Sequence, residues 1–325
     1  MGRSISKVNI LGFPVSRLSM ADTVAYLAEK VEEGRSGPAE AAGGPGVQDP
    51  AAGTDAGRIS EGAGSGETAV GGERTARGEK AAAGEAAAGE IGAAGEALGQ
   101  GAGRAAQRIG CLPLRVVTAN AEILYAASRN AAQAELLHSA HLITADGVGT
   151  VKAARQLGSP GVERVTGVDL LWRLCAEAAR RGWGVYLLGA AEESVAGTAE
   201  RLKREWPQLR LLGWHNGYFD KEEEKKILEE ISGLKPELLF VALGFPRQDL
   251  FVEENRQRLG AGLCMGVGGS FDVLSGRVKR APRWIQKIGM EWAYRFAQNP
   301  KRLGRFWALP RFALAVKRQA KESER

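Results

Sequence analysis

Two kinds of segment alternate along most of this chain: short continuous apolar runs, and longer runs in which apolar residues recur every three or four positions. A short apolar run indicates a buried strand, and a spacing of three or four indicates one face of a helix. The apolar runs predict strands at residues 7–15, 114–120, 141–146 and 183–190. The helical spacing predicts helices at residues 19–34, 121–130, 148–158, 166–182 and 192–207. Because the alternation continues to residue 272, we expect an α/β fold with a Rossmann-like, mostly parallel sheet and helices on both of its faces.

One long segment, residues 36–110, breaks this pattern. It consists mainly of Ala, Gly and Glu and contains no Phe, Trp or Tyr. Such a segment cannot bury enough apolar surface to offset the loss of chain entropy, which is about 1–2 kcal/mol per residue for the backbone. We therefore predict a disordered insertion within a Rossmann-like domain formed by residues 1–35 and 111–275, followed by an appendage at residues 276–325.

The positive charge of the protein is concentrated in that appendage. The 325-residue chain has a formal net charge of +6, whereas residues 277–325 alone contain fourteen Lys and Arg against three Glu. Trp284, Trp292 and Trp307 lie among these cations. Aromatic and basic residues mixed in this way are typical of a segment that lies on a membrane surface, although the same composition also suits a nucleic acid. We expect a basic, α-helical appendage that associates with a membrane.

Other features of the sequence bear on its cellular location. No run of about eighteen apolar residues occurs, and the start of the chain lacks the apolar core and cleavage site of a signal peptide. The three cysteines are far apart and form no CxxC pair, so neither a disulfide framework nor a zinc site is indicated. We expect a cytoplasmic protein that is peripherally associated with the inner leaflet of the cell membrane.

The glycine-containing turn ADGVG at residues 145–149 comes close to a dinucleotide-binding fingerprint but does not complete it. Gly147 and Gly149 supply the first two glycines, and Lys152 stands where the third would be. The sequence also lacks a P-loop, a GxSxG nucleophile motif, an HExxH motif and a D-x-D metal-binding pair. A diphosphate ligand would therefore be held by Arg, Lys and backbone amides, with no metal and no other cofactor.

Ligands of parallel α/β sheets bind at the carboxyl ends of the strands. Five short stretches fall at that edge, namely residues 118–120, residue 146, and residues 189–193, 244–248 and 268–272. Their glycines leave room for close approach, and their polar side chains are candidates for binding a ligand.

These same stretches carry a resemblance to a known family. The motifs are TANAE from Thr118, ADGVG from Ala145, ERVTGVDL from Glu163, LLGAAEES from Leu187, ALGFPRQD from Ala242, GVGGSFDVLSG from Gly266 and EWAYRFAQNPKRLGRFW from Glu291. Together they are similar to the WecG/TagA/CpsF family, glycosyltransferase family 26. The resemblance implies a metal-independent, inverting glycosyltransferase. In the TagA branch, to which the chain is most similar, N-acetylmannosamine passes from its UDP donor (UDP-ManNAc) to the 4-hydroxyl of GlcNAc on undecaprenyl diphosphate, in teichoic acid and cell wall biosynthesis.

The resemblance also assigns roles to individual residues. Asp146 matches the family's aspartate and is the expected catalytic base, although an aspartate there would equally suit a cap for the following helix. The residues matched to substrate binding are Thr118, Asn120, Arg164, Gln248, Asp272, Arg295, Arg302 and Arg305. The last three are implied to fold over the donor and hold its diphosphate. Helix capping, turn formation or surface ion pairing would also account for several of these residues, and Arg247 is expected to pair with solvent or Asp249.

Three alternatives stay open from the sequence. The first is a member of the same family that uses UDP-ManNAcA or another UDP-sugar. The second is an oxidoreductase with a nucleotide cofactor, and the third is a nucleic-acid-binding module. We favour the membrane over a nucleic acid as partner of the basic appendage because the implied acceptor is itself a lipid. The sequence leaves open whether the protein forms a homo-oligomer.

Overall fold

The computed structural model describes residues 5–36, 112–279, 281–282 and 307–323. The chain divides into one unit formed by Met1–Gly37 with Arg104–Arg325 and a second unit, Pro38–Gly103, which lies outside the described residues. The predicted insertion thus falls almost entirely outside the described part of the chain, and its disorder stays a prediction.

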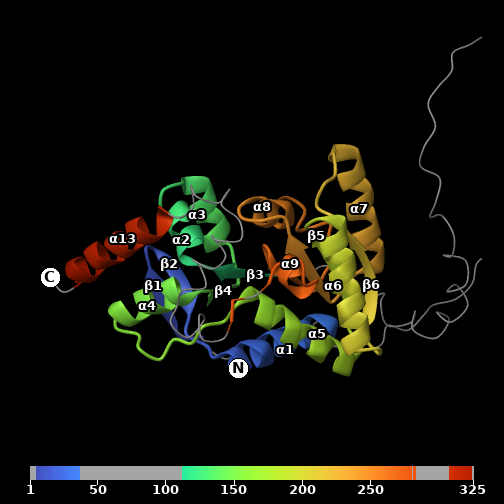
Figure 1. The fold of residues 1–325 in the computed structure, drawn as a ribbon, viewed down its shortest axis with the longest axis horizontal. Helices are drawn as coiled ribbons and strands as arrows, with labels where there is room; N and C mark the ends of the chain where they lie inside the picture. The colour runs from blue at the N-terminus through green and yellow to red at the C-terminus, as the bar shows by residue number, and fades with distance from the viewer. Residues whose placement is uncertain (1–4, 37–111, 280, 283–306, 324–325) are drawn as a thin grey trace, which may run out of the picture. The chain divides into compact units, whose positions relative to one another are not determined.

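The core of the first unit is a six-stranded sheet in which all neighbouring strands are parallel (Figure 1). The strands are β3 (Leu114–Ala119), β4 (Leu142–Ala145), β5 (Gly184–Gly189), β6 (Arg210–His215), β7 (Leu238–Ala242) and β8 (Leu263–Gly266). Their order across the sheet is β4-β3-β8-β7-β5-β6. Every residue of β4, β5, β7 and β8 is buried, which explains why these strands are continuous apolar runs in the sequence.

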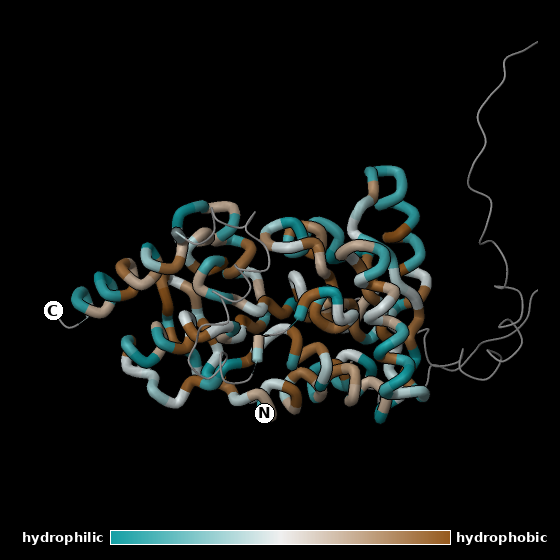
Figure 2. The backbone as a smooth tube through the Cα atoms, viewed as in Figure 1, coloured by the Kyte–Doolittle hydropathy of each residue, from teal (hydrophilic) through white to brown (hydrophobic). Residues whose placement is uncertain are grey.

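Helices cover both faces of this sheet, and apolar residues gather along the central strands (Figure 2). One face packs against α1 (Met20–Ser36), α5 (Gly167–Arg181), α6 (Glu192–Glu205) and α9 (Ser270–Leu274). The other face packs against α2 (Ala121–Ala127), α3 (Ala131–His138), α4 (Val148–Gln156), α7 (Lys221–Leu234) and α8 (Arg247–Glu254). Successive strand residues such as Val116 and Val117 belong to the two different cores. The predicted Rossmann-like α/β fold is confirmed.

The N-terminal segment differs from its prediction. Instead of one strand over residues 7–15, two short strands, β1 (Lys7–Ile10) and β2 (Phe13–Ser16), form an antiparallel hairpin outside the main sheet. The two residues between them, Leu11 and Gly12, have φ values of 52° and 97°. Positive φ at both central residues is what the favoured two-residue hairpin turn requires, so the chain reverses within the apolar run.

A second difference lies after β3. The predicted helix 121–130 ends at Ala127, and a separate helix, α3, follows it. Asn130 begins that helix because its side-chain oxygen accepts a hydrogen bond from the backbone N–H of Gln133.

The C-terminal helix α13 (Ala308–Ser323) packs beside α2, α4 and the hairpin (Figure 1). Phe312 and Val316 are buried in the apolar core that α2 and α4 share with the hairpin. Beside them, the Gln319 side chain accepts a hydrogen bond from Leu11 N–H at 2.8 Å and donates one to Asn9 O at 3.0 Å. The expected C-terminal helix is therefore present and docked on the sheet domain. None of the helices in the described part of the chain is both long and apolar enough to span a bilayer.

Candidate active site

Three oxygen-bearing side chains meet around a glycine at the carboxyl ends of the central strands. Gly167 is the first residue of α5, and a Cβ built on it would lie 3.1 Å from Thr118 Oγ1, 3.5 Å from Ser270 Oγ and 3.7 Å from Asp146 Oδ2. These residues come from the ends of β3 and β4 and from the start of α9. The absence of a side chain at Gly167 lets them approach one another.

Asp146 follows β4 directly, and its backbone N–H donates to Ala119 O at 3.0 Å, which ties it to the end of β3. Its Oδ2 accepts a hydrogen bond from the backbone N–H of Gly167 at 3.1 Å. The helix that follows Asp146 in sequence, α4, has Gly147 at its N-cap and no side-chain cap. The Asp146 side chain therefore binds the start of α5, a helix that begins 21 residues later in the sequence.

The two glycines after Asp146 have a steric role. Gly147 has a φ of 91°, in the left-handed region that favours glycine. A Cβ on Gly149 would lie 3.0 Å from Ala121 Cβ at the start of α2. These glycines let the backbone turn sharply after Asp146 and let α2 and α4 begin side by side.

Thr118 and Asn120 lie at the end of β3, as predicted. The Thr118 hydroxyl donates to Gly266 O at 3.2 Å and so connects β3 to the end of β8. Asn120 is the N-cap of α2, where its Oδ1 accepts from Ile123 N–H at 2.9 Å. This bond uses one of the two polar ends of the Asn120 amide.

Gln248 contacts the glycine turn that follows β8. Its side chain is 4% exposed, and its Oε1 accepts from Gly268 N–H at 3.1 Å. A Cβ on Gly266 would lie 2.3 Å from Gln248 Nε2, so any side chain at this position would displace the Gln248 amide. The Gln248 side chain thus holds the backbone of the glycine turn through the Gly268 amide.

The other predicted binding residues occupy different surroundings. Asp272 Oδ1 accepts from Ser194 Oγ at 2.7 Å, which joins α9 to the first turn of α6. Arg164 precedes Val165, whose N–H donates to Ala145 O beside Asp146. Three further predicted residues, Arg295, Arg302 and Arg305, lie outside the described residues.

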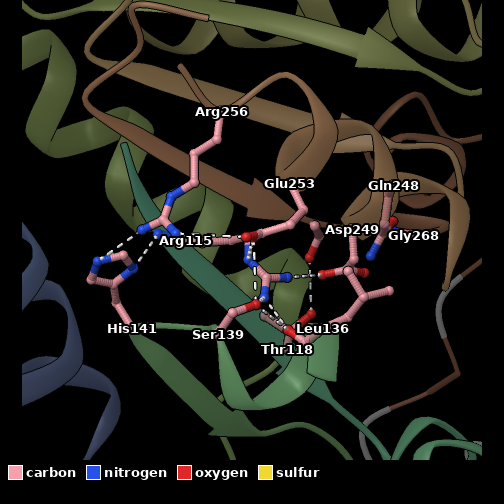
Figure 3. A network of polar contacts seen from close by, with 11 residues as sticks. Arg115, Thr118, Leu136, Ser139, His141, Gln248, Asp249, Glu253, Arg256 and Gly268 are labelled. Carbon is pink, nitrogen blue, oxygen red and sulfur yellow. Dashed lines mark hydrogen bonds and ion pairs between the residues drawn. The ribbon is translucent and has the colours of Figure 1, made fainter. Parts of the chain in front are cut away.

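A buried network of charges lies next to this site (Figure 3). Arg115 Nη1 contacts Asp249 Oδ1 at 3.2 Å, and both side chains are almost completely buried, at 1% and 2% exposure. Burial raises the pKa of Asp249 to about 6, although the adjacent Arg115 opposes the shift. Burial also disfavours the charged form of Arg115 and so lowers the pKa of its guanidinium. Of the two partners expected for Arg247, solvent and Asp249, the structure agrees with solvent: Arg247 is exposed and its guanidinium lies over the ring of Phe219, 5.2 Å from the ring centroid.

Sequence reasoning placed Ser270 within the ligand-binding stretch 268–272 without naming it, and it missed Arg115. Ser270 has a recognisable signal, since it directly follows the glycine turn GVGG. Arg115 has none, because it is 134 residues from Asp249 and sits in an otherwise apolar strand. Within the described ranges, no three His, Cys, Asp or Glu side chains gather as the ligands of a metal ion would.

Comparisons with known proteins agree with the motifs. The sequence profile of the glycosyl transferase WecG/TagA/CpsF family matches residues 94–325. A protein of Bacillus spizizenii is 36% identical over 208 residues, which cover 64% of this chain and 80% of that protein. A protein of Staphylococcus aureus is 36% identical over 214 residues, which cover 65% of this chain and 84% of that protein. A protein of Bacillus subtilis is 32% identical over 218 residues, which cover 67% of this chain and 83% of that protein. All three are named N-acetylglucosaminyldiphosphoundecaprenol N-acetyl-beta-D-mannosaminyltransferase.

The profile spans most of the chain, and the relatives match over most of their own length. The similarity inferred from the motifs is thereby confirmed, and a glycosyltransferase is favoured over an oxidoreductase. The chain belongs to the glycosyl transferase WecG/TagA/CpsF family.

Proposed function

We propose that this protein is an inverting glycosyltransferase that moves N-acetylmannosamine from UDP-ManNAc to the 4-hydroxyl of GlcNAc on undecaprenyl diphosphate. The names of the relatives, at 32–36% identity, support this choice of donor sugar and acceptor. The observation that carries the mechanism is the position of Asp146, fixed at the carboxyl end of β4 beside two hydroxyl side chains.

In this mechanism, Asp146 is the general base. The acceptor hydroxyl gives its proton to the Asp146 carboxylate while its oxygen forms a bond to the anomeric carbon of the sugar. The bond from that carbon to UDP breaks on the opposite face, and UDP leaves with the bonding electrons. Gly167 N–H holds one carboxylate oxygen in place, and the partial positive charge at the start of α5 favours an ionised carboxylate there. The Thr118 and Ser270 hydroxyls donate to Gly266 O and Val267 O, so toward a sugar hydroxyl they can act only as hydrogen-bond acceptors.

The departing diphosphate needs stabilisation of its negative charge. The sequence has no D-x-D pair to bind a divalent metal, so we assign this role to the glycine turn at residues 266–269 and to Arg295, Arg302 and Arg305. Within the turn the assignment falls on the backbone N–H of Gly269, because Val267 N–H donates to Val241 O and Gly268 N–H donates to Gln248 Oε1. For the three arginines, the assignment rests on the motif resemblance alone. Guanidinium groups bind phosphate oxygens bidentately, and the reaction should therefore proceed without a metal.

We further propose that the protein binds the inner surface of the cell membrane, where its lipid acceptor lies. The exposed face of α13 supports this. It carries Leu314, which is 52% exposed, next to Arg311, Lys317, Arg318 and Lys321. Each cation near an anionic leaflet contributes about 1 kcal/mol of binding, so such a face would hold the active site close to the acceptor.

A transfer assay tests the proposal directly. The full-length protein is incubated with radiolabelled UDP-ManNAc, UDP-ManNAcA or UDP-glucose in separate reactions, each with a prenyl-diphosphate-GlcNAc acceptor and EDTA. We expect transfer from UDP-ManNAc at the highest kcat/KM, with the anomeric configuration inverted in the product by NMR. A retained configuration, or dependence on added Mg²⁺ or Mn²⁺, would contradict the mechanism. A higher kcat/KM with another donor would show that the donor sugar is not N-acetylmannosamine and that the protein resembles a different branch of the family in its specificity.

A further inference from the structure

The buried arginine on β3 makes contacts that connect three elements of the fold. Besides its contact with Asp249 in α8, the Arg115 guanidinium donates to the carbonyl of Leu136 and, at 2.6 Å, to the Ser139 hydroxyl, both at the C-terminal end of α3. Its Nε also lies 3.2 Å from Glu253 Oε2 in α8. Figure 3 shows these side chains converging on Arg115. One guanidinium therefore fixes α3 and α8 against β3.

Stability alone does not explain such an arrangement. A buried ion pair generally stabilises a fold no more than well-packed apolar residues of similar volume would, because both charges lose their hydration. Here, burial raises the pKa of Asp249 to about 6 in spite of its contact with Arg115. Keeping this carboxylate ionised near neutral pH thus costs folding free energy. A role of the pair in holding neighbouring residues in position would explain this cost.

Arg115 and Asp249 are each close in sequence to a residue that contacts the end of β8 or the glycine turn after it. Asp249 directly follows Gln248 in the first turn of α8, and Gln248 accepts a hydrogen bond from Gly268 N–H. Arg115 lies three residues before Thr118 on β3, and Thr118 donates to Gly266 O. The end of β8 is therefore contacted by Thr118, which lies on the same strand as Arg115, and the turn that follows is contacted by Gln248, which directly precedes Asp249.

We propose that the Arg115–Asp249 pair is a positioning device for the donor site: by fixing α8 against β3, it places Gln248 so that its amide holds the glycine turn at residues 266–269 in the conformation that binds the donor diphosphate. Asp249 itself does not contact the substrate in this proposal and acts through Gln248. The inference rests on the proposed function of the site, because it assigns that turn to the donor.

The first test measures the turn without any substrate. In Asp249→Asn, which preserves the shape of the side chain but removes its charge, we expect the Gly268 amide to exchange with deuterium severalfold faster than in the wild type. The control is Glu177→Gln near the opposite end of α5, where an ion-paired carboxylate also becomes an amide. This control should leave exchange at Gly268 unchanged. Unaltered exchange in Asp249→Asn would overturn the proposal.

The second test asks whether Asp249 acts through Gln248. With UDP-ManNAc and the lipid-linked acceptor, we expect Asp249→Asn to lower kcat/KM about tenfold, mainly through a higher KM for the donor. In a Gln248→Ala background the same substitution should change kcat/KM by less than about twofold, since residues that act as a unit are not additive. Fully additive losses would show that Asp249 does not act through Gln248 and would overturn the proposal.

A third variant separates positioning from folding. Replacing the pair by apolar residues, Arg115→Met with Asp249→Leu, is expected to retain a cooperative thermal transition but to show the same loss of kcat/KM and the same faster exchange at Gly268. Wild-type kinetics in this double variant would refute a positioning role. If the wild-type protein itself transfers no sugar from any UDP donor, the proposed function fails, whereas the exchange experiment still tests the positioning of the turn.

Discussion

The backbone N–H of Gly167 donates a hydrogen bond of 3.1 Å to Oδ2 of Asp146, so a carboxylate at the end of one strand is held by the first residue of a helix that begins 21 residues later. A helix N-terminus favours an anionic group. The bond also fixes the orientation of the carboxylate beside Thr118 and Ser270. A carboxylate held in a fixed orientation suits proton abstraction from a sugar hydroxyl.

Asp146→Asn should abolish transfer while leaving the fold and UDP binding intact. The amide oxygen of Asn can still accept from Gly167 N–H, but the side chain can no longer take a proton. We expect kcat to fall by about 10²–10⁴-fold, with little change in the Kd for UDP. Kinetic assays and calorimetric titration with UDP measure the two quantities. Turnover at the wild-type rate would remove Asp146 from the role of base.

Gly167→Ala should impair activity more than stability. The new Cβ would lie 3.1 Å from Thr118 Oγ1 and crowd the three side chains around Gly167. We expect kcat/KM to fall on the order of tenfold, because small displacements of positioning groups are costly. The matched control is Gly233→Ala within α7, where a Cβ would meet nothing within 4 Å. That control should raise the free energy of unfolding by about 0.5–1 kcal/mol and leave activity unchanged. Equal kinetics in both variants would contradict the steric role of Gly167.

The two faces of α13 should respond differently to truncation. Phe312→Ala removes a buried side chain from the core shared with α2 and α4, and we expect the free energy of unfolding to fall by about 3–5 kcal/mol. Leu314→Ala, on the exposed face, should change that free energy by less than about 0.5 kcal/mol and instead weaken binding to vesicles that contain phosphatidylglycerol. Chemical denaturation and vesicle sedimentation measure the two effects. Unchanged vesicle binding by Leu314→Ala would argue against this face as the membrane contact.

The sequence predicts the parts of this protein that depend on local pattern. Continuous apolar runs such as the one that forms β5 specify buried parallel strands, and a polar residue at a strand end, such as Asp146, falls at the ligand-binding edge of the sheet. The reversal at Leu11 and Gly12 was missed because the apolar run continues through it; the antiparallel pairing of β1 with β2 and the positive φ values of the two residues reveal the turn.

Contacts between distant segments could not be predicted in the same way. The hydrogen bond from Gly167 N–H to the Asp146 carboxylate joins two segments that are 21 residues apart, and no local pattern around Asp146 indicates it. Similarly, Arg115 looks like an anomaly in an apolar strand until the fold brings Asp249 to it. Both relationships depend on how strands far apart in sequence are ordered in the sheet, which hydrophobic periodicity does not encode.

The pH dependence of stability provides a further test of the buried pair. Burial raises the pKa of Asp249 from its usual 3.8 to about 6. Between about pH 4 and pH 6 the folded protein therefore keeps a proton that the unfolded chain has released, and the contribution of Asp249 to the free energy of unfolding falls as pH rises through this window. Asp249→Asn lacks this contribution. We expect the stability of Asp249→Asn relative to the wild type to increase from pH 4 to pH 7, as measured by urea denaturation.

Activity should change with pH in the opposite direction to stability. Above about pH 6, Asp249 is ionised and pairs with Arg115, which the positioning of Gln248 requires, so kcat/KM of the wild type should rise through pH 6. The other titratable or charged groups near the pair are His141, Glu253, Arg256 and Cys264; burial together with Arg256 lowers the pKa of His141, and burial raises that of Cys264. Because these groups are present in both proteins, the rise near pH 6 should be absent only in Asp249→Asn. If both proteins show the same rise, the ionisation that controls activity belongs to another group, and Asp249 has no part in it.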